Sequence, residues 1–134
     1  CPTGWHVPSD SEWVTLEIYV CEQEGIDGDC VSTFTNTTNY RGNNEGRELK
    51  YTTNVKGHTG TDPDGDDGYG FAGELAGFHN NNGSFLFRGG NAYFWTSSEN
   101  GANAWYRYFA SFNAGVFRAS PDKGYGLSVR CGLD

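Results

Sequence analysis

The sequence predicts a single α+β domain, in which one or two helices precede a meander of short antiparallel strands with long Gly- and Asn-rich loops. Three observations predict this class. They are one strong helix signal near the start of the chain, a series of short alternating stretches in its second half, and a count of 20 glycines. A chain of 134 residues is long enough for one hydrophobic core, so we expect residues 1–134 to form one domain.

The helix signal begins at Ser9. Ser9 is a favourable N-cap residue, and Glu12 follows three residues later, which is the spacing of a capping box. We therefore predict a helix over residues 9–22, which Gly25 should end. Apolar residues at helical spacing should bury one face, and these are Trp13, Leu16 and Val20. Glu17, on the other side of the helix, should stay in solvent.

The remaining elements are shorter. Residues 26–40 are rich in Thr, Asp and Asn and are predicted to form a loop. Residues 44–51 are predicted to form a short second helix with Leu49 as its core contact. Stretches between turn-forming residues, in which successive side chains would point to opposite faces of a sheet, predict strands over residues 84–88, 92–97, 104–112, 116–119 and 125–131.

The charge of the chain argues against two classes of partner. There are 9 basic and 17 acidic residues, which gives a net charge of −8 at pH 7. Nucleic acids are recognised through a basic surface, so we expect no nucleic-acid partner. Anionic membrane surfaces are disfavoured for the same reason. No stretch approaches the roughly 20 apolar residues that span a bilayer, so we expect no membrane insertion.

The four cysteines form no CxxC pair, which argues against a structural zinc site. An even number of cysteines in an acidic, Gly-rich chain favours disulfides and an oxidising compartment, so we expect a secreted or cell-surface protein. Four buried thiols in a cytosolic protein are the alternative. Of the three possible connectivities, we favour Cys1–Cys131, which would join the termini, and Cys21–Cys30, which would close a short loop.

The most acidic stretch is TDPDGDDGYG, over residues 61–70. Alternating carboxylates in a Gly-rich loop suit Ca²⁺, which binds several hard oxygens where the backbone turns sharply. The candidate calcium ligands are Asp62, Asp64, Asp66 and Asp67. The stretch does not match an EF-hand, because Asp67 stands where that loop requires Gly and Gly73 where it requires Glu. The alternative is a solvated turn, since Asp-Pro-Asp-Gly is a strong turn signal.

The stretch over residues 92–110, which we call the aromatic ribbon, is the candidate binding element. Aromatic residues alternate there with small polar ones, as in antibody paratopes, where Tyr and Trp give rigid contact area and Ser, Gly and Asn give adaptable hydrogen bonds. Trp95 and Trp105 are assigned to the core. The candidate contact residues in the ribbon and just after it are Tyr93, Phe94, Glu99, Asn100, Asn103, Tyr106, Arg107, Tyr108, Asn113 and Phe117.

Several motifs carry a resemblance to a known family. They are CPTGWHVPSDSEW (1–13), GRELK (46–50), DGYGFAGELAGF (67–78), NGSF (82–85), YFWTSSE (93–99), AWYRYF (104–109) and KGYGLSVRC (123–131). In this order they resemble the Fibrobacter succinogenes major paralogous domain, which is found in surface and secreted proteins. The resemblance implies a C-type-lectin-like fold, in the version shared with formylglycine-generating enzymes. It also places the first and last cysteine-bearing segments side by side, in agreement with the Cys1–Cys131 pairing.

The sequence departs from the family pattern at its start. Family members usually carry strands before the Cys-Pro-x-Gly-Trp motif, whereas this sequence begins at that motif. Either an upstream segment is cut away or another chain supplies the sheet edge, and an open edge would permit self-assembly. Asn36 and Asn82 begin N-glycosylation tripeptides, which are also common by chance.

These observations favour a domain that recognises a glycan or protein ligand on a surface through the aromatic ribbon. The alternative is a structural subunit of a surface assembly or filament. A formylglycine-generating type of oxidase is a remote alternative, because such enzymes use reactive cysteines and the ribbon contains none. The three histidines show no metal-ligand spacing, and no nucleophile motif is present, so we expect no enzymatic activity.

Overall fold

The structure is a computed structural model that describes residues 1–25, 28–51 and 65–134. The helices are α1 (Asp10–Glu24), α2 (Cys30–Phe34) and α3 (Glu45–Glu48). The strands are β1 (Trp5–His6), β2 (Asn39–Arg41), β3 (Phe78–His79), β4 (Phe85–Leu86), β5 (Asn91–Asn100), β6 (Asn103–Ala110), β7 (Val116–Ala119) and β8 (Gly132–Leu133). The predicted mixture of helices and antiparallel strands is confirmed.

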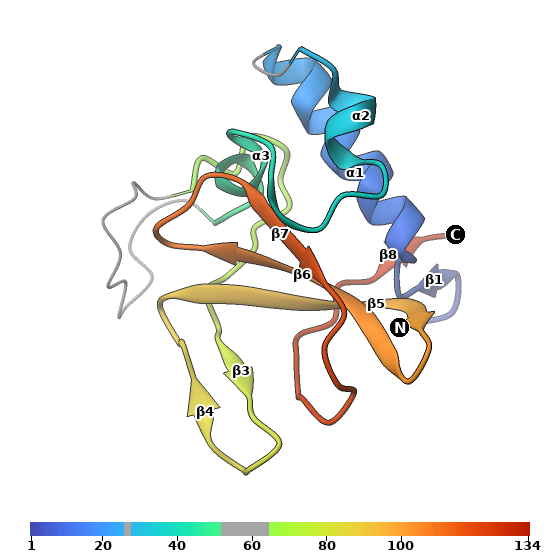
Figure 1. The fold of residues 1–134 in the computed structure, drawn as a ribbon, viewed down its shortest axis with the longest axis vertical. Helices are drawn as coiled ribbons and strands as arrows, with labels where there is room; N and C mark the ends of the chain where they lie inside the picture. Colours follow the sequence, from blue (N-terminus) through green and yellow to red (C-terminus); the bar gives the residue numbers. More distant parts are fainter. Residues whose placement is uncertain (26–27, 52–64) are drawn as a thin grey trace.

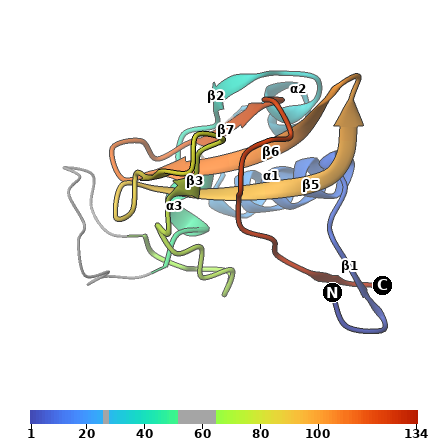
Figure 2. The ribbon, with the colours of Figure 1, turned by 90° about the horizontal axis from the view of Figure 1, so that it is seen from below.

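The centre of the fold is a four-stranded antiparallel sheet with the strand order β2-β7-β6-β5 (Figure 1). Strands β5 and β6 form its long hairpin, and the view in Figure 2 shows α1 running beside the sheet. Two small ribbons complete the fold. β1 pairs with β8 and brings the two ends of the chain together, and β3 pairs with β4 in a hairpin that extends away from α1.

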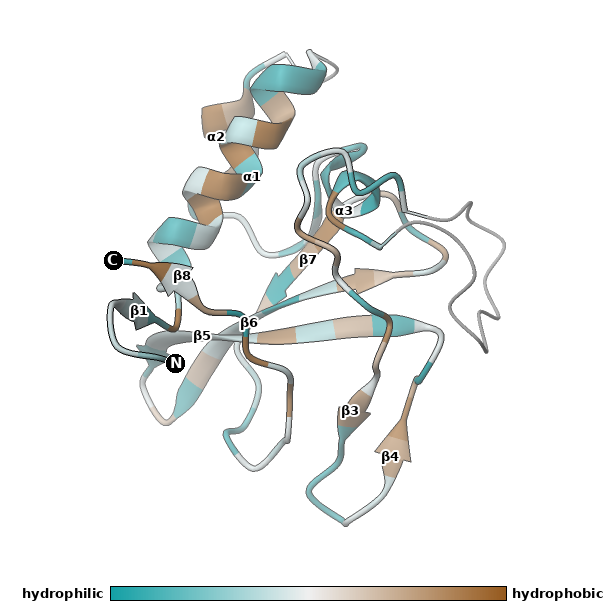
Figure 3. Ribbon diagram, turned by 180° about the vertical axis from the view of Figure 1, so that it is seen from behind, coloured by the Kyte–Doolittle hydropathy of each residue, from teal (hydrophilic) through white to brown (hydrophobic). Residues whose placement is uncertain are grey.

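Helix α1 begins and ends as the sequence predicts. The Ser9 hydroxyl accepts a hydrogen bond from the backbone N–H of Glu12, and the Glu12 carboxylate accepts one from the backbone N–H of Ser9. Gly25 adopts the left-handed conformation, with φ 63°, and its N–H donates to Cys21. Figure 3 shows hydrophobic and hydrophilic residues mixed along the helix, and its buried side chains are Trp13, Glu17, Val20 and Cys21.

The expectation that Glu17 stays in solvent is wrong. Its side chain is fully buried between α1 and the sheet, where it pairs with Arg41 and Arg107. The rule that places charged residues in solvent fails here because long arginine side chains on the sheet supply the opposite charge.

The main hydrophobic core lies between α1 and one face of the sheet. The ring of Trp13 lies 5.8 Å from that of Phe94 and 6.3 Å from that of Phe109, measured between centroids. Phe71 closes this group, with its ring 5.4 Å from that of Trp13. Leu49, at the end of α3, is fully buried in the same core, which confirms its predicted role.

Three predicted segments differ from the structure. The expected loop over residues 26–40 contains α2 and β2, because Asp29 caps α2 through the N–H of Ser32. The strand predicted over residues 84–88 ends at Leu86, since Phe87 has a positive φ of 58°. The segment 125–131 forms only single bridges to its neighbours, and the last strand is β8.

The two predicted disulfides are present, Cys1–Cys131 and Cys21–Cys30. The first joins the segments that lead into β1 and β8, and the second links α1 to α2. Disulfides are typical of oxidising, extracellular environments. Among the helices of the described ranges, none is long and apolar enough to cross a membrane.

Candidate ligand-binding face

The alternation of side chains gives the central sheet two different faces. On β6, Arg107 and Phe109 point toward α1, where they contact Glu17 and Trp13. Tyr106 and Tyr108 therefore lie on the opposite face, because successive residues of a strand alternate. The same alternation separates Phe94, which packs on Trp13, from its neighbour Tyr93.

On that opposite face, four aromatic residues stand directly across from one another on all four strands. Tyr40 of β2 is in register with Phe117 of β7, Phe117 with Tyr108 of β6, and Tyr108 with Tyr93 of β5. The ring centroids are 5.0, 4.5 and 5.0 Å apart in this order. These separations match the spacing of neighbouring strands, so the register itself generates the row. We call Tyr40, Phe117, Tyr108 and Tyr93 the aromatic ladder.

The orientation of the rings decides what the ladder offers to a ligand. Tyr108 stacks on Phe117 with an interplanar angle of 24°, and the neighbouring Tyr106 stacks on Tyr108 at the same angle with centroids 5.9 Å apart. Neighbouring rings of the row therefore contact one another and are held in fixed orientations. Tyr40, Tyr106, Tyr108 and Phe117 are partly exposed, whereas Tyr93 is only 8% exposed.

A cavity of about 250 Å³ adjoins the ladder at β5. The aromatic residues around it are Phe78, Phe87, Tyr93, Tyr106 and Tyr125, and Pro121 and Leu127 complete its wall. Phe78 links it to the ladder, since its ring lies 5.0 Å from that of Tyr93. The lining contains no charged side chain, so this part of the face suits an uncharged ring better than an ion.

Tyr40, Tyr93 and Tyr106 stay protonated at neutral pH. Burial is the main cause that raises the pKa of Tyr40, Tyr93 and Tyr106 above the ordinary value of 10. Neighbouring tyrosines raise the pKa values further, because two phenolates would repel each other. The hydroxyl of Tyr93 accepts a hydrogen bond of 2.7 Å from the side-chain amide of Asn91. The hydroxyl of Tyr40 is buried, so Tyr106 and Tyr108, which are partly exposed, are the tyrosines of the sheet that can offer hydroxyl groups to a ligand.

Two predicted contact residues lie on the wrong face. Phe94 belongs to the core, and Arg107 is fully buried, with its guanidinium bonded to Glu17 and Asp10. Both are therefore removed from the set of ligand contacts. The cause is the strand alternation, since Phe94 and Arg107 are paired across β5 and β6 in the inward-facing register.

The polar candidates lie at the two ends of β6. Glu99, Asn100 and Asn103 surround the β5–β6 turn, where Glu99 pairs with Lys123 at 2.5 Å and both asparagine side chains donate to Ser120. Asn113, in the turn after β6, accepts a hydrogen bond from the N–H of Gly115. Of the ten candidates, the structure brings together Tyr93, Tyr106, Tyr108 and Phe117.

Some residues of this face escaped the sequence analysis. Tyr40 lies in a segment that was predicted to be a loop, and Phe78, Phe87 and Tyr125 come from the β3–β4 hairpin and the 120–127 segment. No local pattern joins them to the ribbon, since only the tertiary fold does so.

The two tryptophans assigned to the core, Trp95 and Trp105, are partly exposed, and the guanidinium of Arg118 lies 3.8 Å from the centre of the Trp105 ring.

The described part of the acidic stretch, residues 65–70, forms no assembled metal site. Asp62 and Asp64 lie outside the described residues. Asp66 pairs with Arg47 at 2.9 Å, and Asp67 accepts a hydrogen bond from the N–H of Ala72. Within the described ranges, no group of three or more His, Cys, Asp or Glu side chains is placed to hold a metal ion. Calcium binding by residues 62–67 stays a prediction.

No curated protein and no solved structure matches the chain. A family model does match, and it covers the aromatic ribbon, β7, and both disulfides. The Fibrobacter succinogenes major domain accounts for residues 1–131, and the chain therefore belongs to this family.

Proposed function

We propose that this is a secreted or cell-surface binding domain with a C-type-lectin-like fold, which recognises a glycan or protein through the aromatic ladder and the adjoining cavity. We propose binding without a catalytic step. The observation that carries the proposal is the register that aligns Tyr40, Phe117, Tyr108 and Tyr93 across the whole sheet. Such a row on the sheet face away from α1 packs against no helix, and its partly exposed members, Tyr40, Phe117 and Tyr108, would meet a partner.

The chemistry of the ladder fits recognition of a neutral ligand. Tyrosine combines a large rigid ring with one hydroxyl and loses little conformational entropy on binding. The stacked arrangement holds these rings in place before a ligand arrives, which lowers the cost of association. On the α1 side of the sheet, the ion pairs of Arg107 and Arg118 with Asp10 tie β6 and β7 to the helix. These ion pairs should keep the strands that carry the ladder rigid.

The test uses the full chain on glycan and protein arrays, followed by titration of the ligand that is found. We expect Tyr106→Ser combined with Tyr108→Ser to lower affinity at least about tenfold, because interface tyrosines are frequent hot spots. Tyr19→Ser is the matched control, since Tyr19 is an exposed tyrosine of α1 that lies 5.8 Å from Tyr69 and outside the ladder. Unchanged binding by a folded double variant would disprove the proposal.

Assembly is a second candidate, and one observation favours it. Phe85, Leu86 and Phe87, in and just after β4, are 79%, 39% and 58% exposed. An exposed apolar edge strand can pair with another chain. By contrast, the outer edge of β5 is paired in part, because Trp95 donates to Ser128 and Ser128 to Tyr93. Sedimentation of the wild type and of Phe85→Lys tests this candidate, which fails if both remain monomeric.

A further inference from the structure

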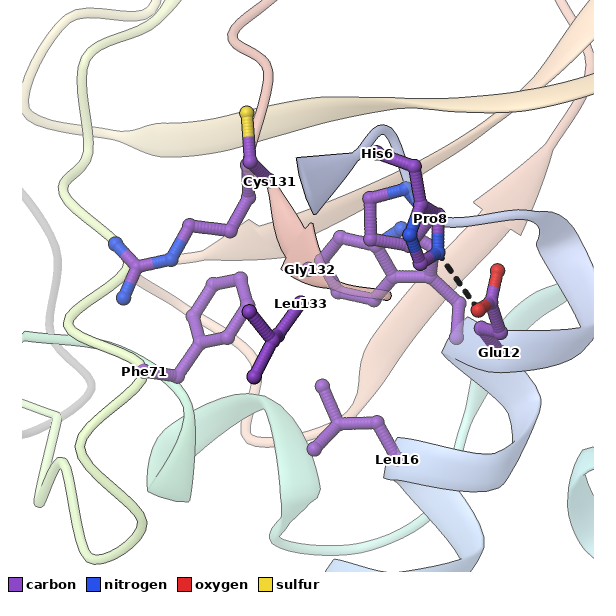
Figure 4. A pocket seen from close by; sticks show the side chains of 10 residues that line it. His6, Pro8, Glu12, Leu16, Phe71, Cys131, Gly132 and Leu133 are labelled. Atoms are coloured by element: carbon purple, nitrogen blue, oxygen red, sulfur yellow. Dashed lines mark hydrogen bonds and ion pairs between the residues drawn. The ribbon is translucent and has the colours of Figure 1, made fainter. Parts of the chain in front are cut away.

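A second pocket lies on the other side of the sheet, between α1 and the β1–β8 ribbon. Its volume is about 260 Å³. Figure 4 shows Leu133 between Phe71 and Leu16, with His6 and Glu12 at the rim. Trp13 and Arg130 also line it. The pocket is separate from the aromatic ladder, because Trp13 packs on Phe94 and Phe109, which face α1.

The first unusual feature of this pocket is an unsatisfied donor. Trp13 is 2% exposed, and its Nε1 has no hydrogen-bond partner within the described part of the chain. A buried N–H group without an acceptor costs about 1–3 kcal/mol. Native proteins satisfy nearly all such groups with protein, ordered water or a bound molecule. Because the Trp13 side chain lines the pocket, its indole N–H signal reports on a molecule that enters it.

The second feature is a cation that has no carboxylate. Arg130 is exposed at the pocket and makes no ion pair with any described acidic residue. Its guanidinium lies 5.0 Å from the centre of the Phe71 ring, which holds it at the pocket wall. A guanidinium held in this way presents its N–H groups to an oxyanion.

The acidic groups at the opposite rim are already satisfied. Glu12 bonds to Ser9 and, at 2.7 Å, to Nε2 of His6, and Asp134 bonds to Nδ1 of His6 at 2.7 Å. Arg130 is thus the charged side chain of this pocket that lacks an oppositely charged partner among the described residues, and it is a donor. A fitting ligand supplies acceptors and no cation.

We propose that this pocket binds a small carboxylate whose body is a single apolar or aromatic ring. The ring would lie against Leu16, Phe71 and Leu133, and the carboxylate would pair with Arg130. The volume supports this size, because an engineered apolar cavity of about 150 Å³ already accepts benzene. The net negative charge of the protein does not attract anions. Selectivity for a carboxylate over a neutral ligand would therefore come from the guanidinium of Arg130.

The experiment titrates phenylacetate into the isotopically labelled full chain and follows the assigned indole N–H signal of Trp13. Phenylacetamide, a neutral molecule of the same shape, is titrated in parallel. We expect phenylacetate to shift the Trp13 signal. Arg130→Gln should weaken phenylacetate binding about tenfold, as expected for loss of a charged hydrogen bond, while phenylacetamide binding stays the same.

Arg88→Gln is the matched control, since Arg88 is an exposed arginine that does not line the pocket. It should bind phenylacetate as the wild type does. The proposal is overturned if phenylacetate leaves the Trp13 signal unmoved, which would mean that water alone fills the pocket. It is also overturned if Arg130→Gln and Arg88→Gln bind phenylacetate equally well.

Discussion

Nε of Arg107 lies 2.5 Å from Oε1 of Glu17, and both side chains are fully buried between α1 and the sheet. The other oxygen of Glu17 binds Arg41 of β2. Asp10, at the start of α1, holds Arg107 at 2.7 Å and Arg118 of β7 at 2.6 Å. Two carboxylates of one helix thus bind three guanidinium groups on three strands.

This network is the polar counterpart of the hydrophobic core. Burial acts to raise the pKa of Asp10, but the hydrogen bond to Arg118 and the charge of Arg107 keep the pKa below its ordinary value. The carboxylate of Asp10 therefore stays charged. Removal of one member leaves the others buried without a partner, which costs more than the intact network contributes.

Glu17→Gln should lower the free energy of unfolding by about 3–5 kcal/mol, because the amide cannot neutralise Arg41 and Arg107 in the interior. Chemical denaturation measures the change. The control is Glu22→Gln, an exposed glutamate of the same helix, which should change stability by less than about 0.5 kcal/mol. Equal losses in the two variants would show that the network contributes nothing specific.

His6 should make stability depend on pH. Its hydrogen bonds to Asp134 and Glu12 raise the pKa of the imidazole above 6.5. The charged form is favoured in the folded state, so this contribution is fully present below pH 6.5 and is lost as the pH rises through the folded pKa. The stability difference between the wild type and His6→Gln should therefore be larger at pH 5 than at pH 9. A difference that is the same at both pH values would contradict this assignment.

The capping box predicts a second titration. Hydrogen bonds from the Ser9 hydroxyl and backbone, followed by that from His6, lower the pKa of Glu12 to about 2. Ser9→Ala should move the pKa of Glu12 back toward 4.5 and cost about 1 kcal/mol of stability. NMR titration of the Glu12 side chain measures the shift. Ser9→Thr, which retains a hydroxyl that can both accept from the Glu12 N–H and donate to the Glu12 carboxylate, should preserve most of the stability, and an unmoved Glu12 pKa in Ser9→Ala would refute the role of the cap.

The two disulfides should contribute unequally. They close loops with sequence separations of 130 and 9 residues. The chain-entropy model gives about 5 kcal/mol for the longer loop and about 3 kcal/mol for the shorter one. Replacement of Cys1 and Cys131 by Ser should therefore destabilise the protein more than replacement of Cys21 and Cys30. Thermal unfolding of the two double variants gives the comparison, and the reverse order would show that strain or residual structure outweighs loop closure.

The sequence predicts those features of the fold that depend on local spacing. The capping box fixes the start of α1, and alternation around the Asn100-Gly101 turn gives the β5–β6 hairpin. It also shows that Tyr106 and Tyr108 share a face. It does not show which face is buried, because both faces of β6 are rich in large side chains, and the candidate contacts therefore include residues of both faces, such as Arg107 and Tyr108.

The candidate site depends on contacts that no local pattern contains. Tyr40 joins the ladder only because β2 pairs with β7, far away in the sequence. Glu17 and Arg107 are likewise 90 residues apart, and neither position alone indicates a buried ion pair. The pocket at Trp13 arises where the two ends of the chain meet α1.

Neighbouring residues of β6 test which face of the sheet is the core. Phe109 is fully buried against Trp13, whereas Tyr108 is partly exposed in the ladder. Phe109→Ala should cost about 3–5 kcal/mol, the usual loss for a large core side chain. Tyr108→Ala should cost only about 1–2 kcal/mol, from the loss of its ring contacts. Chemical denaturation of both variants measures these two losses in the free energy of unfolding. If Tyr108→Ala were as destabilising as Phe109→Ala, the ladder would be a second core and could not serve as an open binding face.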